Sequence, residues 1–221
     1  MLRRLYRMCA VVVLGACGAG ANEPGPTAPA PPAQVPPFQP APAAPQANMQ
    51  PATMGPQAGA PRLPAPDARQ VALGNALNAY RQRRGLPALP LSRSLSYVAQ
   101  VHVLDLDRSR DVRPAHCNAH SWSSAGPWSP CCYTKDHAQA RCMWSKPREL
   151  TGFPGNGYEI AMTGNISGGP DRLVERWTES AAHHAVMINQ GSWTAPWASM
   201  GVGVGEVHAA IWFAREVDPS P

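Results

Sequence analysis

Two side chains that can do chemistry stand four positions apart in the segment Trp177-Thr-Glu-Ser-Ala-Ala-His-His184: the carboxylate of Glu179 and the imidazole of His183. If this segment is one helix, both side chains lie on the same face, because positions i and i+4 are neighbours on a helix surface. A carboxylate beside an imidazole can hold a divalent metal ion or exchange protons with a substrate. This pair is therefore the first candidate site of the sequence.

The chain lacks the compact motifs of better-defined sites. It has no H-E-x-x-H zinc motif, and Asn165-Ile-Ser167-Gly-Gly does not match the G-x-S-x-G of a nucleophile elbow. Gly201, Gly203 and Gly205 lack the spacing of a dinucleotide-binding loop, and we expect them to let another element pack closely on a strand. The candidate metal ligands are therefore scattered along the chain rather than grouped in one local motif.

Hydrophobic periodicity predicts two helices at the start of the folded region. Asp67 is the expected N-cap of a helix over residues 68–84, and Ser92 is expected to begin a second helix with an apolar stripe from Leu95 to Leu106. His102 lies on the apolar stripe of this second helix. We interpret it as a packed core histidine, because no second metal ligand lies one turn away.

A third helix and three strands are expected later in the chain. Pro170 is well placed in the first turn of a helix that extends to about Ala182. Residues 157–162, which include Glu159, form one strand candidate, and residues 200–205 and 207–213 are typical of a β-hairpin. Helices before and between antiparallel strands indicate an α+β fold.

An even number of cysteines remains in the folded region, and in an exported protein this favours two disulfide bonds over a zinc site. Adjacent cysteines are badly placed to bond each other. The pairing is therefore 117–131 with 132–142, or 117–132 with 131–142, and a tetrathiolate zinc site is the minor alternative. Each bond closes a loop and would raise the free energy of unfolding by on the order of 3 kcal/mol. The four residues are Cys117, Cys131, Cys132 and Cys142.

The N-terminus carries an export signal. Residues 1–16 combine three arginines with an apolar run that is too short to span a bilayer. The run ends in Leu14-Gly-Ala-Cys17, which resembles the lipobox of bacterial lipoproteins, in which cleavage exposes a cysteine that carries acyl chains. The alternative is an ordinary secretory signal cut after Ala19 or Ala21. A lipidated Cys17 would hold the protein on a membrane without a spanning helix.

A proline-rich linker separates the signal from the folded domain. Fifteen of the 26 prolines lie between residues 18 and 66, so we expect residues 17–66 to be a lipidated terminus followed by a disordered tether. Residues 67–221 then form one domain. Without residues 1–16 the chain has 16 basic and 14 acidic groups, a net charge of +2, which gives no reason to expect nucleic acid as a partner.

Four segments occur in the order of the motifs of the CAP superfamily, which joins cysteine-rich secretory proteins, antigen 5 proteins and pathogenesis-related 1 proteins. The resemblance extends over about residues 70–215. The segments are Cys117-Asn-Ala-His120-Ser, Gly157-Tyr-Glu159-Ile, Trp177-Thr-Glu179-Ser and Ala182-His183-His184-Ala-Val-Met.

The resemblance implies a single-domain three-layer α-β-α sandwich with a central cleft. Matched motif by motif, the two histidines and two acids of the cleft would be His120, Glu159, Glu179 and His183, with His184 as an alternate for the last. Glu159 departs from the family pattern in its surroundings, because Tyr and Ile flank it where many members have Gly and Asn. A Cys-Asn-Tyr signature late in the family is also missing here.

The resemblance favours binding over catalysis, because the family shares its cleft more widely than any one reaction. We expect a lipoprotein of the bacterial cell envelope, or alternatively a secreted protein, that binds a lipid, a sterol-like molecule or an envelope polymer. No cofactor is required, but a divalent metal such as Zn²⁺ fits the His/Glu cleft. The alternatives are a metal-dependent hydrolase, with His120 and His183 as ligands and Glu159 or Glu179 as general base, and a purely structural module.

Overall fold

The computed structural model describes residues 62–220. The predicted signal peptide, the lipidated Cys17 and nearly all of the proline-rich linker lie outside the described residues. Within the described part of the chain, no helix combines the length and apolar character needed to cross a membrane.

Two long helices begin where the sequence predicts. Helix α1 (Ala68–Gln82) has Asp67 as its N-cap in a reciprocal capping box with Gln70. Helix α2 (Arg93–Ser109) begins after Ser92, whose side chain accepts from the backbone N–H of Leu95 at 2.9 Å.

Three antiparallel strands form the sheet: β1 (Tyr158–Thr163), β2 (Ser199–Val204) and β3 (His208–Ala214), in the order β1-β3-β2. The hairpin of β2 and β3 and the separate strand β1 agree with the prediction. Because β3 is central, β1 and β2 each have one edge without a strand partner among the described residues.

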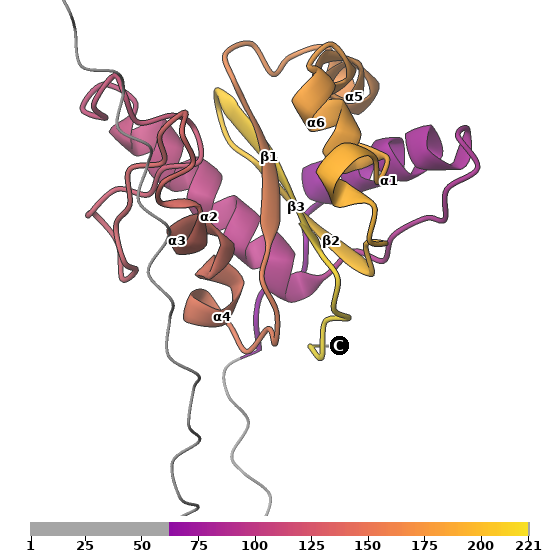
Figure 1. The fold of residues 1–221 in the computed structure, drawn as a ribbon, viewed down its shortest axis with the longest axis horizontal. Helices are drawn as coiled ribbons and strands as arrows, with labels where there is room; N and C mark the ends of the chain where they lie inside the picture. The colour runs from indigo at the N-terminus through magenta and orange to yellow at the C-terminus, as the bar shows by residue number, and fades with distance from the viewer. Residues whose placement is uncertain (1–61, 221) are drawn as a thin grey trace, which may run out of the picture. The chain divides into compact units, whose positions relative to one another are not determined.

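Helices cover both faces of this sheet (Figure 1). Helices α1, α5 (Gly169–Thr178) and α6 (Ala181–Met187) share an apolar core with one face. Helix α2 packs against the other face with α3 (Ala140–Trp144), while the short α4 (Lys146–Leu150) follows α3 and contacts α2. A 3₁₀ turn, η1 (Gly191–Trp193), follows α6. The predicted α+β, three-layer α-β-α sandwich is confirmed.

Glycines on β2 let α2 approach the sheet closely. A Cβ atom added at Gly201 would clash with the backbone of Leu95 and Ser96, and one added at Gly203 would clash with the carbonyl group of Ala99. The expectation that these glycines serve packing is therefore confirmed.

Two disulfide bonds hold the irregular segment after α2: Cys117–Cys132 closes a loop within it, and Cys131–Cys142 ties it to α3. This is one of the two pairings that the sequence left open, and it rules out the tetrathiolate zinc site because all four sulfurs are used. Both disulfides fit an extracytoplasmic location.

The prediction of one helix from Pro170 to Ala182 is wrong. Helix α5 ends at Thr178, Glu179 follows as its C-cap, and Ser180 is the N-cap of α6, with its side chain accepting from the backbone N–H of His183 at 3.4 Å. A serine that caps a new helix competes with continuation of the old one. Glu179 and His183 therefore do not share the face of one helix.

We predict that Gly203→Ala lowers the free energy of unfolding by about 1–3 kcal/mol, because the new methyl group forces α2 away from the sheet. Urea unfolding followed by tryptophan fluorescence measures this change. Gly152→Ala is the matched control, since a Cβ atom there meets nothing within 4 Å. Equal stabilities of the two variants would contradict the packing role of Gly203.

Candidate functional site

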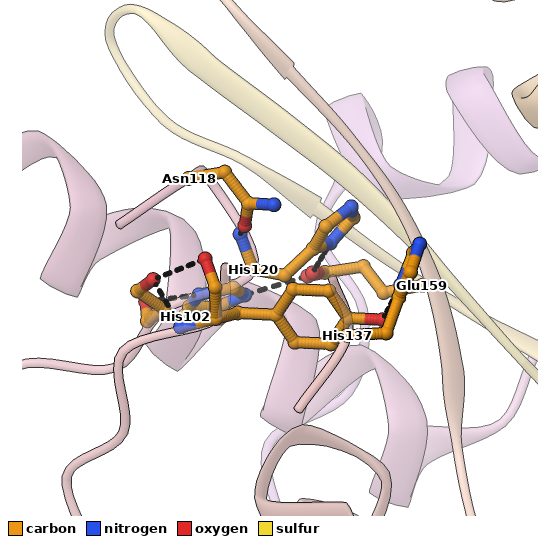
Figure 2. Close-up of polar contacts among 7 residues, drawn as sticks. His102, Asn118, His120, His137 and Glu159 are labelled. Carbon is orange, nitrogen blue, oxygen red and sulfur yellow. Dashed lines mark hydrogen bonds and ion pairs between the residues drawn. The ribbon is translucent and has the colours of Figure 1, made fainter. Parts of the chain in front are cut away.

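The carboxylate of Glu159 lies at the centre of a polar cluster between α2 and the edge of the sheet. Its side chain is fully buried, with one oxygen 2.6 Å from Nδ1 of His102 and the other 2.7 Å from Nδ1 of His120. Figure 2 shows this carboxylate between the two imidazole rings. Both oxygens of Glu159 are thus engaged by histidines.

His102 faces a hydrogen-bond acceptor at each ring nitrogen. Its Nδ1 lies against Glu159, and its Nε2 is 3.0 Å from the backbone carbonyl oxygen of Ser121. Only the doubly protonated imidazolium donates at both positions. The ring also stacks on Trp122, with centroids 4.3 Å apart and an interplanar angle of 6°, and such stacking suits a cationic ring.

The histidines keep Glu159 ionised despite its burial. Burial is the largest influence and would raise the pKa of this carboxyl, but the charge of His102 and the hydrogen bonds from His102 and His120 outweigh it. The pKa of Glu159 is lowered from 4.5 to about 2. A buried anion therefore holds two imidazoles in fixed orientations.

His120 connects this buried cluster to the surface. Its side chain is 19% exposed, and because Nδ1 donates to Glu159, Nε2 is the nitrogen left for a ligand. The backbone N–H of His120 donates to the side chain of Asn118 at 2.9 Å, and the ring meets Tyr133 edge-on at 5.1 Å. The disulfide-bonded segment that begins at Cys117 thus sets the position of His120.

His183 lies in the first turn of α6 and lines the same cleft as His120. Burial lowers the pKa of His183, the nearby His120 lowers it further, and Glu159 acts in the opposite direction. The neutral ring can therefore offer a lone pair at neutral pH.

The other two predicted cleft residues lie elsewhere. The side chain of Glu179 is 65% exposed, with its carboxylate 3.7 Å from the guanidinium of Arg172. It borders a smaller hollow of about 360 Å³, which His183 also lines but His120 does not. His184 points away from the cluster, and its Nε2 is 2.8 Å from the hydroxyl of Tyr80.

The cleft that contains His120, Glu159 and His183 has a volume of about 760 Å³. Its wall beyond the histidines is aromatic. The ring centroid of Tyr158 lies 5.5 Å from that of Trp144 and 5.2 Å from that of Trp193. Arg215 lies at this aromatic end, 5.5 Å from the centroid of the Tyr158 ring. The cleft therefore combines polar imidazoles, a broad apolar wall and one cation.

Two imidazoles that line the cleft offer nitrogen atoms of the type that divalent metal ions bind. His120 offers Nε2 with Glu159 behind its Nδ1, the second-shell arrangement typical of metal-binding histidines, and His183 offers a second neutral imidazole. Among the described residues, the one group of three ligand types with mutual metal-like spacing is His116 with Cys117 and Cys132. It is unsuited to a metal, because both sulfurs are consumed in a disulfide.

A family comparison identifies the fold. The model of the CAP, or cysteine-rich secretory protein, family matches residues 75–204, which is more than half of the chain. The chain belongs to the CAP family. The matched region includes the whole His120–Glu159–His183 cluster of this CAP domain.

Solved structures of bacterial proteins resemble the CAP domain at low identity. An extracellular protein with an SCP domain from Bacillus anthracis is 17% identical over 67% of this chain, with a TM-score of 0.47. An outer surface protein from Borrelia burgdorferi is 15% identical over 66% of this chain and 90% of its own, with a TM-score of 0.45.

A cysteine-rich secretory protein from Staphylococcus aureus is 16% identical over 67% of this chain, with a TM-score of 0.43. The chain spans only 40% of the Bacillus protein and 38% of the Staphylococcus protein. No curated protein matches the sequence significantly.

Sequence reasoning missed the part that His102 has in the cluster. The expectation of a packed histidine is correct for its burial, since His102 is 0% exposed, but the ring is paired with Glu159 rather than with apolar neighbours alone. A buried imidazole needs hydrogen-bond partners. An acid predicted on a buried strand, such as Glu159, is the signal that could have paired the two.

We predict that Glu159→Gln lowers the free energy of unfolding at pH 7 by on the order of 3 kcal/mol, because it removes the anion that pairs with the buried His102 ring and breaks the ion pair. The folded-state pKa is depressed, so the stabilisation by ionised Glu159 is complete above pH 4.5 and is lost as the pH falls towards about 2. Urea unfolding at several pH values should show this acid loss in the wild type and a flatter profile in the variant. Glu175→Gln, at an exposed ion pair, is the control that should keep the wild-type profile; identical profiles for all three proteins would refute the assignment.

Proposed function

We propose that this CAP domain is an extracytoplasmic binding module, anchored to a membrane by its lipidated N-terminus, whose cleft binds a ligand with the help of a divalent metal ion. The observation that carries the proposal is the fixed orientation of His120, whose Nδ1 is held by Glu159 so that Nε2 remains for a metal in a cleft of about 760 Å³. A bound ion would add a Lewis acid that attracts an anionic or carbonyl group of the ligand.

Binding is favoured over hydrolysis because neither Glu159 nor Glu179, the two carboxylates considered as the general base, is placed to act as one. Both oxygens of Glu159 accept from histidines, and the carboxyl, with a pKa of about 2, is a poor proton acceptor at neutral pH. Glu179, the other candidate base, borders a different hollow and is not beside His120. These positions of the two carboxylates favour a cleft that binds a ligand over one in which a carboxylate activates a water molecule.

We predict that the purified domain binds Zn²⁺ at pH 7.5 and that His120→Ala or His183→Ala weakens this binding by at least about tenfold. Isothermal titration calorimetry measures both affinities. His184→Ala is the matched control from the next position on α6, because His184 bonds Tyr80 instead of lining the cleft. Absence of zinc binding in the wild type, or equal loss in the control, would refute the metal proposal.

The anchor proposal has a separate test. We expect Cys17→Ser to move the full-length protein from the membrane fraction to the soluble fraction of the cells that make it, because the acylated residue is lost. Mass spectrometry of the mature wild-type N-terminus should find an acylated Cys17. An unmodified terminus beyond Cys17 would show an ordinary secretory signal instead.

A further inference from the structure

The outer edge of β1 presents backbone groups to the cleft. In an antiparallel strand, alternate residues direct both N–H and C=O to the neighbouring strand, and the residues between them direct theirs away. The N–H of Gly164 donates to Val207, which continues the pairing with β3, whereas the N–H of Gly157 donates to Trp144 on the other side. Because the direction alternates between these two ends, the backbone groups of Glu159, Ala161 and Thr163 point away from β3, which we call outward.

The backbone groups at these three outward positions have no hydrogen-bond partner among the described residues. Strand β1 pairs only with β3, and no residue in the range 62–220 donates to or accepts from the outward backbone groups of Glu159, Ala161 and Thr163. Glu159 and Ala161 are each 7% exposed as whole residues, Thr163 is exposed, and all three line the hollows beside the strand. Backbone groups in such a position favour a ligand that supplies matching donors and acceptors.

Two adjoining hollows that share His183 follow this edge, and we call them together the groove. The cleft of about 760 Å³ borders Tyr158 and Glu159, and the hollow of about 360 Å³ borders Ala161 to Thr163, with His183 lining both. One side of the groove comes from α6, and the other comes from α3 and the disulfide-bonded segment with His120. In Figure 1, β1 has α3 and α4 on one side and α6 on the other.

We propose that this groove binds an extended peptide segment of another molecule, which adds to β1 as a fourth strand. The inference rests on the proposed function, in which the cleft binds a ligand, and it names the chemical class of that ligand. Three alternate backbone positions match the repeat of an extended peptide, which offers a donor and an acceptor at every second residue. A hydrocarbon chain in the same groove would leave these polar groups unsatisfied.

The charge of the groove selects an acidic group at one end of the peptide. The exposed guanidinium of Arg215 lies over Tyr158 and Trp197, at 5.5 and 5.8 Å from the ring centroids, and no described carboxylate pairs with it. A carboxylate of the peptide beyond Glu159 would meet this cation. The proline-rich linker of the chain itself is a poor occupant, because proline has no N–H to donate to a strand edge.

The test uses a phage-displayed library of random heptapeptides selected on the purified domain, followed by synthesis of the enriched peptides with capped ends. We expect slowed hydrogen exchange at the backbone N–H groups of Glu159, Ala161 and Thr163 in the complex, measured by NMR. N-methylation of alternate peptide residues should weaken binding by about tenfold or more in one of the two registers only. Arg215→Gln should weaken the binding of acidic peptides severalfold.

A protein variant provides an independent check. Thr163→Pro removes one outward N–H without touching the bonds to β3, so it should lower peptide affinity by about tenfold while the domain stays folded. Thr163→Val keeps the N–H and is the matched control. Enrichment of no peptide, equal binding to both variants, or protection of other amides would overturn the inference. If zinc still binds in that case, only the peptide inference fails and the proposed metal-assisted binding function stands.

Discussion

The buried ion pair between Glu159 and His102 is the interaction on which the cleft depends. An unpaired carboxylate in this position would be neutralised by burial, and an unpaired imidazolium would be equally costly. When the two are paired, each charge is neutralised by the other. The second oxygen of Glu159 is then available to orient His120. Removing one partner of a buried ion pair destabilises a protein strongly, whereas the intact pair adds little net stability. Such a pair therefore mainly fixes one geometry of its side chains.

The rest of the fold brings the partners of Glu159 to it. Helix α2 places His102 beside Glu159, because Gly201 and Gly203 let the helix backbone approach the sheet closely. The ring of Trp122 stacks on one face of the His102 ring. The disulfides hold the segment that carries His120, which has little regular structure of its own. On the opposite side of β1, the break between α5 and α6 places His183 in the first turn of a new helix, where burial keeps it neutral.

Much of this architecture is readable from the sequence, because capping residues and hydrophobic periodicity are local signals. Asp67 and Ser92 begin their helices as predicted, and β1 and the β2–β3 hairpin are close to the expected ranges. The pairing of the cysteines stayed open because Cys131 and Cys132 are adjacent, so two pairings have nearly the same spacing. The helix break at Ser180 was missed because periodicity alone does not distinguish one long helix from two short ones. For the same reason the position of Glu179 was predicted wrongly.

The measurement that tests this account most directly is the ¹⁵N NMR spectrum of the His102 ring in the isolated domain at pH 7. Two acceptors at 2.6 and 3.0 Å require both ring nitrogens to carry a proton, so the account predicts the chemical shifts of an imidazolium in the wild type and of a neutral ring in Glu159→Gln. A neutral His102 in the wild type, with one unprotonated nitrogen, would contradict the ion pair and remove the physical reason for the orientation of His120.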